Sequence, residues 1–258
     1  DLMAGRYGRP VRFKTLVSWP RDSLYYARNR WAGRIRDDRG CPVLDSPVNN
    51  ATAHYLHNML FLLGESTDVA ASPRRLEANL LRANPIENYD AACLRVVTAG
   101  DVEMLFYSAH CVSRKLGPRF ELNCEDARVR FDGQSLQALR GDERVRDYGM
   151  PEAGADRKLF WNLAAARGEP VPPPPCTITT ARPHIQVVNG LQEIAVQDVP
   201  PGRFRRDPRD TGAPLTWTDG LFEAMSAAFA ADRLPGPDEL DWLAPSRTVD
   251  LDNHPGFE

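Results

Sequence analysis

Two histidines and an asparagine occur at helical spacing near residue 50. Asn50, His54 and His57 are separated by four and three residues, so on an α-helix they project from one side. Two imidazoles three residues apart can line a substrate pocket or hold a metal, although a histidine is often only a structural residue. No third cysteine, histidine or carboxylate lies nearby at a recognised metal-ligand spacing. We therefore interpret the pair as part of a polar substrate pocket.

A helix must position these side chains. Ser46 followed by Pro47 is a helix start signal, and Gly64 supplies a stop. At about 100° per residue, an apolar stripe falls on the side opposite the histidines. The stripe consists of Thr52, Leu56, Met59, Leu60 and Leu63. The pattern predicts a helix with one buried face and one face open to solvent or a cleft.

A second group of polar and aromatic side chains lies in the loop-like stretch 21–44. It contains Tyr25, Tyr26, Arg28, Asn29, Arg30 and Trp31. Rings stack on the C–H faces of a sugar, and amides and guanidinium groups hydrogen-bond its hydroxyls. Arg28, Asn29 and Trp31 are therefore candidate substrate-binding residues. The alternative is a loop that its own tyrosines and tryptophan hold against the domain.

Three segments around the predicted helix carry a family resemblance. They are Gly40-Cys-Pro-Val-Leu-Asp45, Asn50-Ala-Thr-Ala-His54 and Leu60-Phe-Leu-Leu-Gly64. Together they resemble the central segment of the glucose-fructose oxidoreductase, inositol dehydrogenase and rhizopine catabolism (Gfo/Idh/MocA) family. The flanking segments 9–21, 26–33 and 82–90 resemble a subgroup of its sugar-type oxidoreductases.

The resemblance implies a two-domain enzyme of which this chain is the second part. Family members have an N-terminal Rossmann domain and a C-terminal, largely antiparallel sheet domain that binds substrate and builds the oligomer. The sequence has neither a Gly-x-Gly-x-x-Gly nor the Glu-Lys-Pro that supplies the family's catalytic lysine. We therefore expect the Rossmann domain to be missing here. NAD or NADP would bind the full-length protein, and no cofactor is expected on this fragment.

The resemblance also implies roles for single residues. His54 would act as acid, base or polariser beside the reacting hydroxyl, with Asn49, Asn50 and His57 near the substrate. The family's acid, four residues before its histidine, is Asn50 in this register. A shift of five residues instead puts Asp45 at the acid and Asn49 at the histidine. The spacing from His54 to Gly64 favours the first register.

The rest of the chain predicts an α+β fold. We expect a large, mostly antiparallel sheet with helices packed on one face, because the turns between the runs are short. Both faces of the 102–110 run are partly apolar, so we expect the face away from the helices to build a homo-oligomer. The predicted strands span 10–20, 74–83, 91–99, 102–110, 119–124 and 127–131.

The C-terminal half predicts further helices. Residues 134–155 are expected to be irregular, 157–167 a short helix, 170–175 an extended proline spacer and 177–195 a second strong helix. His184 on that helix is a second candidate for substrate binding, although a surface role is favoured. We expect residues 1–196 to form the substrate-binding and oligomerisation domain. Residues 197–258, which include an amphipathic run at 218–231, form an extension packed on it.

Composition excludes several classes of function. A net charge of −3 with arginines interspersed among acids gives no nucleic-acid footprint. No apolar run approaches the length of a membrane span. Five widely spaced cysteines indicate reduced thiols in a cytoplasmic protein rather than a disulfide framework.

Two functions remain after the sequence is considered. The first is the substrate-binding and oligomerisation domain of an NAD(P)-dependent sugar or polyol oxidoreductase, inactive without its Rossmann domain. The alternative is a non-catalytic carbohydrate-binding or scaffolding module.

Overall fold

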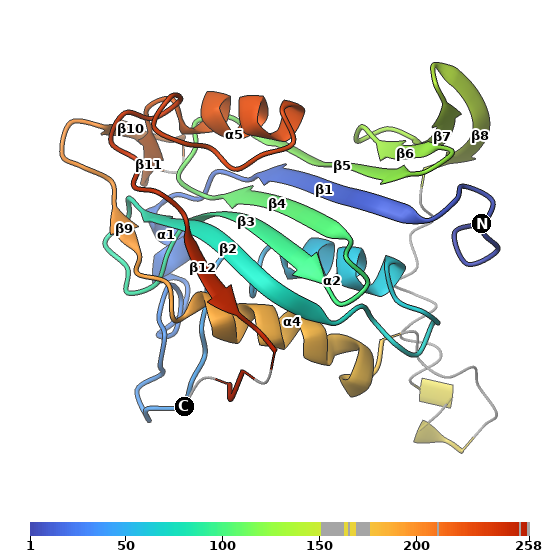
Figure 1. Ribbon diagram of the computed structural model, residues 1–258. Helices are drawn as coiled ribbons and strands as arrows, with labels where there is room; N and C mark the ends of the chain where they lie inside the picture. Colours follow the sequence, from blue (N-terminus) through green and yellow to red (C-terminus); the bar gives the residue numbers. More distant parts are fainter. Residues whose placement is uncertain (151–162, 165, 169–175, 211, 253, 257–258) are drawn as a thin grey trace.

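The protein is built on one large sheet (Figure 1). The computed structural model describes residues 1–150, 163–164, 166–168, 176–210, 212–252 and 254–256. In these residues, ten strands form a sheet of order β12-β2-β3-β4-β1-β5-β6-β7-β8, with β9 beside β2. They are β1 (Pro10–Ser18), β2 (Pro73–Arg82), β3 (Ala91–Thr98), β4 (Glu103–Ala109), β5 (Leu116–Cys124), β6 (Arg128–Phe131), β7 (Leu136–Arg140), β8 (Glu143–Gly149), β9 (Gln197–Asp198) and β12 (Arg247–Asp250).

The sheet is mixed, which corrects the expected mostly antiparallel arrangement. β1 runs parallel to β4, and β9 runs parallel to β2. The short turns that join β2 to β3 and β3 to β4 force antiparallel neighbours. No such constraint acts on β1, because a long connection separates Ser18 from the next strand at Pro73. β1 therefore inserts between β4 and β5, with a parallel neighbour on one side.

Helices cover both faces of the sheet, whereas the sequence predicted helices on one. Helices α2 (Ala53–Leu62) and α4 (Ile178–Leu191) pack on one face, and α5 (Leu221–Ala230) lies on the other (Figure 1). The reason is the apolar character of both faces of the central strands. Leu94 and Phe106 belong to the α2 and α4 core, and Leu105 and Tyr107 to the α5 core. Part of the face expected to build an oligomer is therefore occupied by α5.

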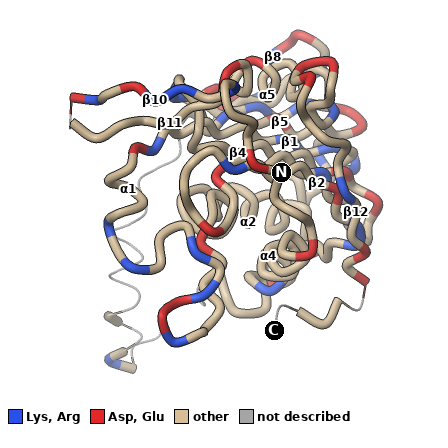
Figure 2. Tube along the Cα trace, turned by 90° about the vertical axis from the view of Figure 1, so that its left-hand side faces the viewer, with Lys and Arg blue, Asp and Glu red and all other residues tan. Residues whose placement is uncertain are grey.

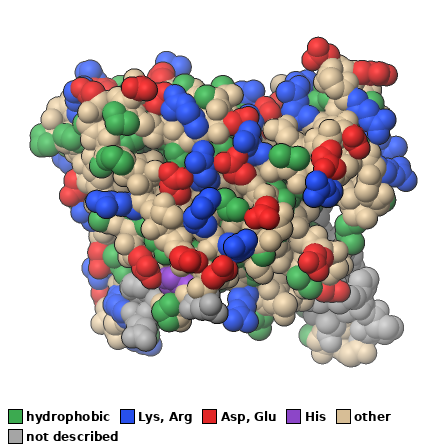
Figure 3. All heavy atoms as spheres, in the orientation of Figure 1, with side chains coloured by type: hydrophobic (Ala, Val, Ile, Leu, Met, Phe, Trp, Pro, Cys, Tyr) green, Lys and Arg blue, Asp and Glu red, His purple; other side chains and the backbone are tan. Residues whose placement is uncertain are grey.

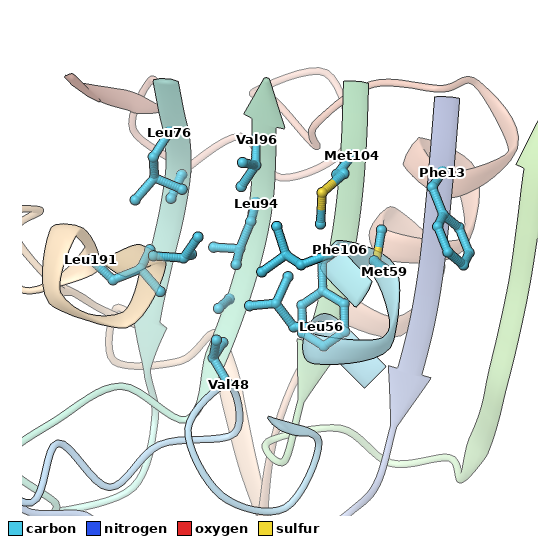
Figure 4. Packing of buried hydrophobic residues seen from close by; sticks show 14 of the residues in the cluster. Phe13, Val48, Leu56, Met59, Leu76, Leu94, Val96, Met104, Phe106 and Leu191 are labelled. Carbon is cyan, nitrogen blue, oxygen red and sulfur yellow. The ribbon is translucent and has the colours of Figure 1, made fainter. Parts of the chain in front are cut away.

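The helix that carries the histidine pair begins later than predicted. Residues 47–52 form turns, and α2 starts at Ala53. The Thr52 hydroxyl lies 2.7 Å from the Pro47 carbonyl oxygen and 2.9 Å from the Ser108 hydroxyl, which ties the turns to β4. The predicted apolar face is confirmed: Leu56, Met59 and Leu60 are fully buried. Figure 4 shows this helix face against side chains of the central strands, among them Leu94, Met104 and Phe106.

The C-terminal half differs from the expectation in several places. Residues 134–155, expected to be irregular, contain β7 and β8. The predicted helix 157–167 and the proline spacer 170–175 lie largely or wholly outside the described residues. Helix α4 is confirmed, and Thr177 caps it. Beyond residue 196 the chain adds β9 and β12 to the sheet, a separate hairpin of β10 (Phe204–Pro208) and β11 (Pro214–Thr218), and α5.

The surface carries charges of both signs. Figure 3 shows acidic and basic side chains interspersed over the face viewed in Figure 1, with hydrophobic side chains only in small patches. Within the described residues, no helix is both long and apolar enough to cross a membrane.

The packing of α2 predicts unequal effects for two leucines on the same helix. Leu56 is fully buried, and Leu62 is 42 % exposed. Leu56→Ala should lower the free energy of unfolding by about 2 to 5 kcal/mol, because a cavity replaces the lost side chain. Leu62→Ala should cost less than about 1 kcal/mol. Urea unfolding measures both, and equal losses would show that α2 is not anchored through Leu56.

Candidate functional site

The candidate site begins where two parallel strands end. The Trp19 amide donates to the Ala109 carbonyl at 2.9 Å, and the Arg21 amide donates to the His110 carbonyl at 3.1 Å. These bonds hold the loop after β1 beside the end of β4. The loop then forms the short helix α1 (Ser23–Ala27), whose first turn is capped by the Asp22 carboxylate. Helix α1 lies at the side of the sheet that faces the viewer in Figure 2, where basic and acidic stretches alternate along the nearby loops.

Rings and guanidinium groups alternate along this loop from Trp19 to Trp31, and Tyr55 of α2 extends the row. The Tyr55 and Trp19 ring centroids are 5.7 Å apart, and the Arg21 guanidinium lies 5.6 Å from the Trp19 ring. The Tyr25 ring contacts Arg21 at 4.9 Å and Arg28 at 3.7 Å, and Arg28 also lies 5.2 Å from the Trp31 ring. We call this set the aromatic–arginine strip: Tyr55, Trp19, Arg21, Tyr25, Arg28 and Trp31. Such a strip can stack on sugar C–H faces and donate hydrogen bonds to hydroxyls.

A buried carboxylate stands beside the strip. Asp45 is 4 % exposed, and its Oδ2 accepts a hydrogen bond from the Gly33 amide at 2.6 Å. Its Oδ1 accepts from the Asn50 side-chain amide at 2.6 Å, and the Arg28 Nη2 lies 3.7 Å from Oδ2. The carboxylate is therefore fixed in orientation by neutral donors and one cation.

His110 is a site residue that the sequence analysis did not single out. It is 2 % exposed, its ring packs edge-on against Tyr25 at 5.2 Å, and its Nδ1 lies 3.4 Å from the Tyr26 hydroxyl. Its Nε2 has no hydrogen-bond partner among the described residues. Burial, together with the smaller effect of the Arg21 and Arg28 charges, lowers the pKa of His110 to about 3. The only feature of the sequence that could have indicated this role for His110 was its position at the end of a predicted strand.

The predicted helix histidines lie in three different settings. His54 is exposed, and its ring packs edge-on against Tyr55 at 5.3 Å, at one end of the strip. His57 points towards α4, where its Nε2 lies 3.2 Å from the Thr180 carbonyl oxygen. His184 is only 6 % exposed, and its Nε2 lies 3.1 Å from the Val48 carbonyl oxygen. Burial lowers the pKa of His184, and the surface role favoured for it is wrong, because α4 turns this side chain inwards.

The predicted polar residues divide into two groups. Arg28 and Asn50 contact Asp45, and Trp31 lies beside Arg28. Asn29 accepts hydrogen bonds from the Trp31 and Ala32 amides, and Asn49 donates to the Val43 and Leu44 carbonyls, so both shape the loops. The structure thus places Asp45, rather than a residue at position 50, as the carboxylate of the cluster. In the described part of the chain, no three histidine, cysteine or acidic side chains gather as metal ligands.

The neutral, buried state of His110 predicts a dependence of stability on pH. The unfolded chain binds a proton at this residue below its usual pKa of 6.5, and the folded chain does not until about 3. The unfolded state therefore binds more protons in this window, and the free energy of unfolding falls as the pH falls.

Replacing His110 by phenylalanine should remove this effect. Between pH 7 and pH 5 the native protein should lose about 1 to 2 kcal/mol more stability than His110→Phe. His54→Phe, at an exposed position, is the matched control and should keep the native pH dependence. Urea titrations at a series of pH values measure this, and an unchanged slope in His110→Phe would show that His110 is protonated in the folded protein.

Comparison with known proteins relates the fold to sugar oxidoreductases. No protein-family model matches the sequence, and no characterised protein matches it in sequence. Aldose-aldose oxidoreductase from Caulobacter crescentus, solved with glycerol, matches with a TM-score of 0.51 and 13 % identity over 74 % of this chain and 54 % of its own. The WlbA dehydrogenase from Bordetella pertussis, solved with NADH and UDP-GlcNAcA, matches at 0.50 with 19 % identity over 74 % and 54 %.

A levoglucosan dehydrogenase, solved with NADH, matches at a TM-score of 0.50 with 13 % identity, over 73 % of this chain and 56 % of its own. The chain therefore spans about half the length of the solved structures that it matches. The resemblance inferred from the sequence is confirmed at the level of the fold: this chain shares the architecture of part of the Gfo/Idh/MocA-type sugar oxidoreductases.

Proposed function

We propose that this chain is the substrate-binding domain of an NAD(P)-dependent oxidoreductase that acts on sugars or polyols. The observation that carries the proposal is the shared fold. About three quarters of this chain matches about half of each sugar oxidoreductase with which it was compared. A fold match alone does not identify a binding site. The aromatic–arginine strip and Asp45 form a set of side chains suited to a polyhydroxylated ligand.

The chain's own residues would bind and orient the substrate. Tyr25 and Trp31 present ring faces, and Trp31 is 41 % exposed. Asp45 keeps acceptor capacity beyond its bonds to Gly33 and Asn50, so it can receive a substrate hydroxyl at a fixed position. In this proposal His54, exposed at the Tyr55 end of the strip, exchanges the hydroxyl proton.

The residues of this chain do not fit the dinucleotide itself. A pyrophosphate needs a glycine-rich turn that leads into the first turn of a helix, and the sequence has no Gly-x-Gly-x-x-Gly. We therefore assign NAD or NADP binding to another domain of the full-length protein. The chain by itself is expected to bind sugar and to turn nothing over.

A non-catalytic carbohydrate-binding or scaffolding module is the second candidate. The observation that favours it is the replacement of family acid and histidine positions by Asn50 and Asn49 in the two registers considered. Such a module would show no turnover in the full-length protein under any condition, whether or not it binds sugar.

We also propose that the protein forms a homo-oligomer through the part of the sheet face that α5 leaves open. A row of alternating charges crosses this face, with Arg95 forming ion pairs with Glu77 at 3.3 Å and with Glu103 at 2.9 Å. Alternating charges can pair with a second copy, and they favour specificity over affinity. The free, exposed thiols of Cys41 and Cys176 are in keeping with a reducing, cytoplasmic location.

The role of Asp45 predicts the effect of removing its charge. Asp45→Asn should reduce NAD(P)-dependent sugar oxidation by the full-length protein at least about 100-fold, because the negative charge and one of the two positioned acceptor oxygens are lost. The same variant of this chain should bind sugar at least about 10-fold more weakly. The measurements are NADH absorbance for turnover and saturation-transfer NMR for binding.

Two further variants make this test decisive. Asp38→Asn removes an exposed carboxylate that pairs only with Arg30 and Arg34 among the described residues, so it should change neither turnover nor binding. His54→Ala should lower turnover and leave cofactor affinity nearly unchanged. Full activity in Asp45→Asn with an unchanged melting temperature would contradict the proposal.

A further inference from the structure

Two guanidinium groups share one tyrosine ring in the strip. Arg21 lies 4.9 Å and Arg28 3.7 Å from the Tyr25 ring centroid. Like charges that contact the same ring repel each other, and their attraction to the ring compensates only in part. An arrangement of this kind is favourable when an anion is present to pair with both groups.

The carboxylates of the described structure do not neutralise the pair. Asp45 is the only acidic side chain in the described residues that forms an ion pair with either arginine, at 3.7 Å from Arg28. Both Asp45 oxygens already accept hydrogen bonds from Gly33 and Asn50. Arg21 forms no ion pair in the described part of the chain, and its Nε is buried without a hydrogen-bond partner. A buried, unpaired donor on a cation is costly unless a ligand completes it.

His110, which neighbours the two arginines, carries no negative charge that could balance them. It also has a buried atom without a hydrogen-bond partner. His110 is 2 % exposed and packs against the same Tyr25 ring at 5.2 Å. Its Nε2 is another buried atom with no partner among the described residues. Two positive charges therefore face one carboxylate, and the cluster keeps a surplus of positive charge.

The other arginines of the loop differ from this pair. Arg30 and Arg34 share the Asp38 carboxylate, at 3.7 Å and 2.9 Å. The Arg30 side chain is 90 % exposed, whereas the Arg28 side chain is 27 % exposed. Arg30 and Arg34 therefore each have a carboxylate partner, whereas Arg21 has none among the described residues.

Building on the proposed function, we propose that the sugar or polyol bound at the strip carries an anionic oxygen group, a carboxylate or a phosphate, and that Arg21 and Arg28 bind this group. The Arg28 Nη1 donates to the Tyr25 carbonyl oxygen at 2.5 Å, and the remaining N–H groups of Arg21 and Arg28 can hold the oxygens of one anion. Tyr25 and Trp31 would then contact the sugar ring, and Asp45 one of its hydroxyls.

The affinities of three related sugars for this chain test the inference. Glucose, glucuronate and glucose 6-phosphate share a ring and differ in the group on its last carbon. Calorimetry and ligand-observed NMR at low salt should show glucuronate, glucose 6-phosphate or both binding at least about 10-fold more tightly than glucose. The preference should shrink as salt is added, because screening weakens the ionic term. Which of the two anions binds better identifies the source of the charge.

Arginine variants locate the effect. Arg21→Gln and Arg28→Gln should each reduce the ratio of anionic-sugar affinity to glucose affinity at least about 5-fold, because the charge that pairs with the anion is lost. Arg30→Gln is the matched control on the same loop, and it should keep the native preference. Melting temperatures within a few degrees of the native value would show that the variants fold.

The outcomes separate the two proposals. Equal affinity for the neutral and anionic sugars overturns the inference and leaves the proposed function standing. The same holds for an anion preference that survives both Arg21→Gln and Arg28→Gln. Binding of none of the three sugars, by a chain that melts cooperatively, counts against the proposed function itself.

Discussion

The parallel pairing of β1 with β4 is the constraint on which the site depends. Parallel strands end at the same edge of a sheet, so Ser18 lies beside Ala109 and the two following segments leave the sheet together. One segment begins with Trp19 and leads to Arg21 and Tyr25, and the other begins with His110. An antiparallel β1 would have delivered these groups to opposite ends of the sheet. The mixed topology therefore brings together side chains that are about 90 residues apart in the sequence.

The same arrangement decides the electrostatics of the site. The strip rests on a buried, neutral histidine and holds two guanidinium groups against one ring, with a single carboxylate beside them. Because Asp45 is bonded to a backbone amide and a side-chain amide, its orientation does not depend on Arg28 alone. The carboxylate is thus held by its own donors, and the N–H groups of Arg21 and Arg28 that have no acceptor are left for a ligand. This division suits a protein that must recognise one group on a sugar and position another.

The sequence predicted the local elements of the fold well and its long-range arrangement poorly. Alternating apolar runs and short turns located β2, β3 and β4, and helical spacing located α2, α4 and α5. The direction of β1 was not predictable, because a connection of more than 50 residues allows either direction. The sequence showed that both faces of β4 are partly apolar, but the face away from α2 and α4 was assigned to another subunit. In the structure, α5 of this chain packs on that face. The exposed β8 was missed because its polar pattern resembles that of a loop.

The candidate site shows the same division between local and distant information. Arg28, Trp31 and Asn50 were found because their types suit sugar chemistry, and the structure groups them. His110 was missed, since nothing in its own segment indicated that loop 19–31 would cover it. His184 was assigned to the surface because the helical spacing did not fix which face of α4 the sheet would bury.

Chemical-shift mapping of the labelled chain with glucuronate tests the central claim most directly. The account predicts that the largest shifts fall on the indole N–H groups of Trp19 and Trp31 and on the amides of residues 20–33, 45–50 and 110. It also predicts that the amides of β8 (Glu143–Gly149), at the far edge of the sheet, stay unchanged. Shifts that cluster elsewhere on the molecule, or that spread evenly over its surface, would contradict the assignment of the strip as the sugar-binding site.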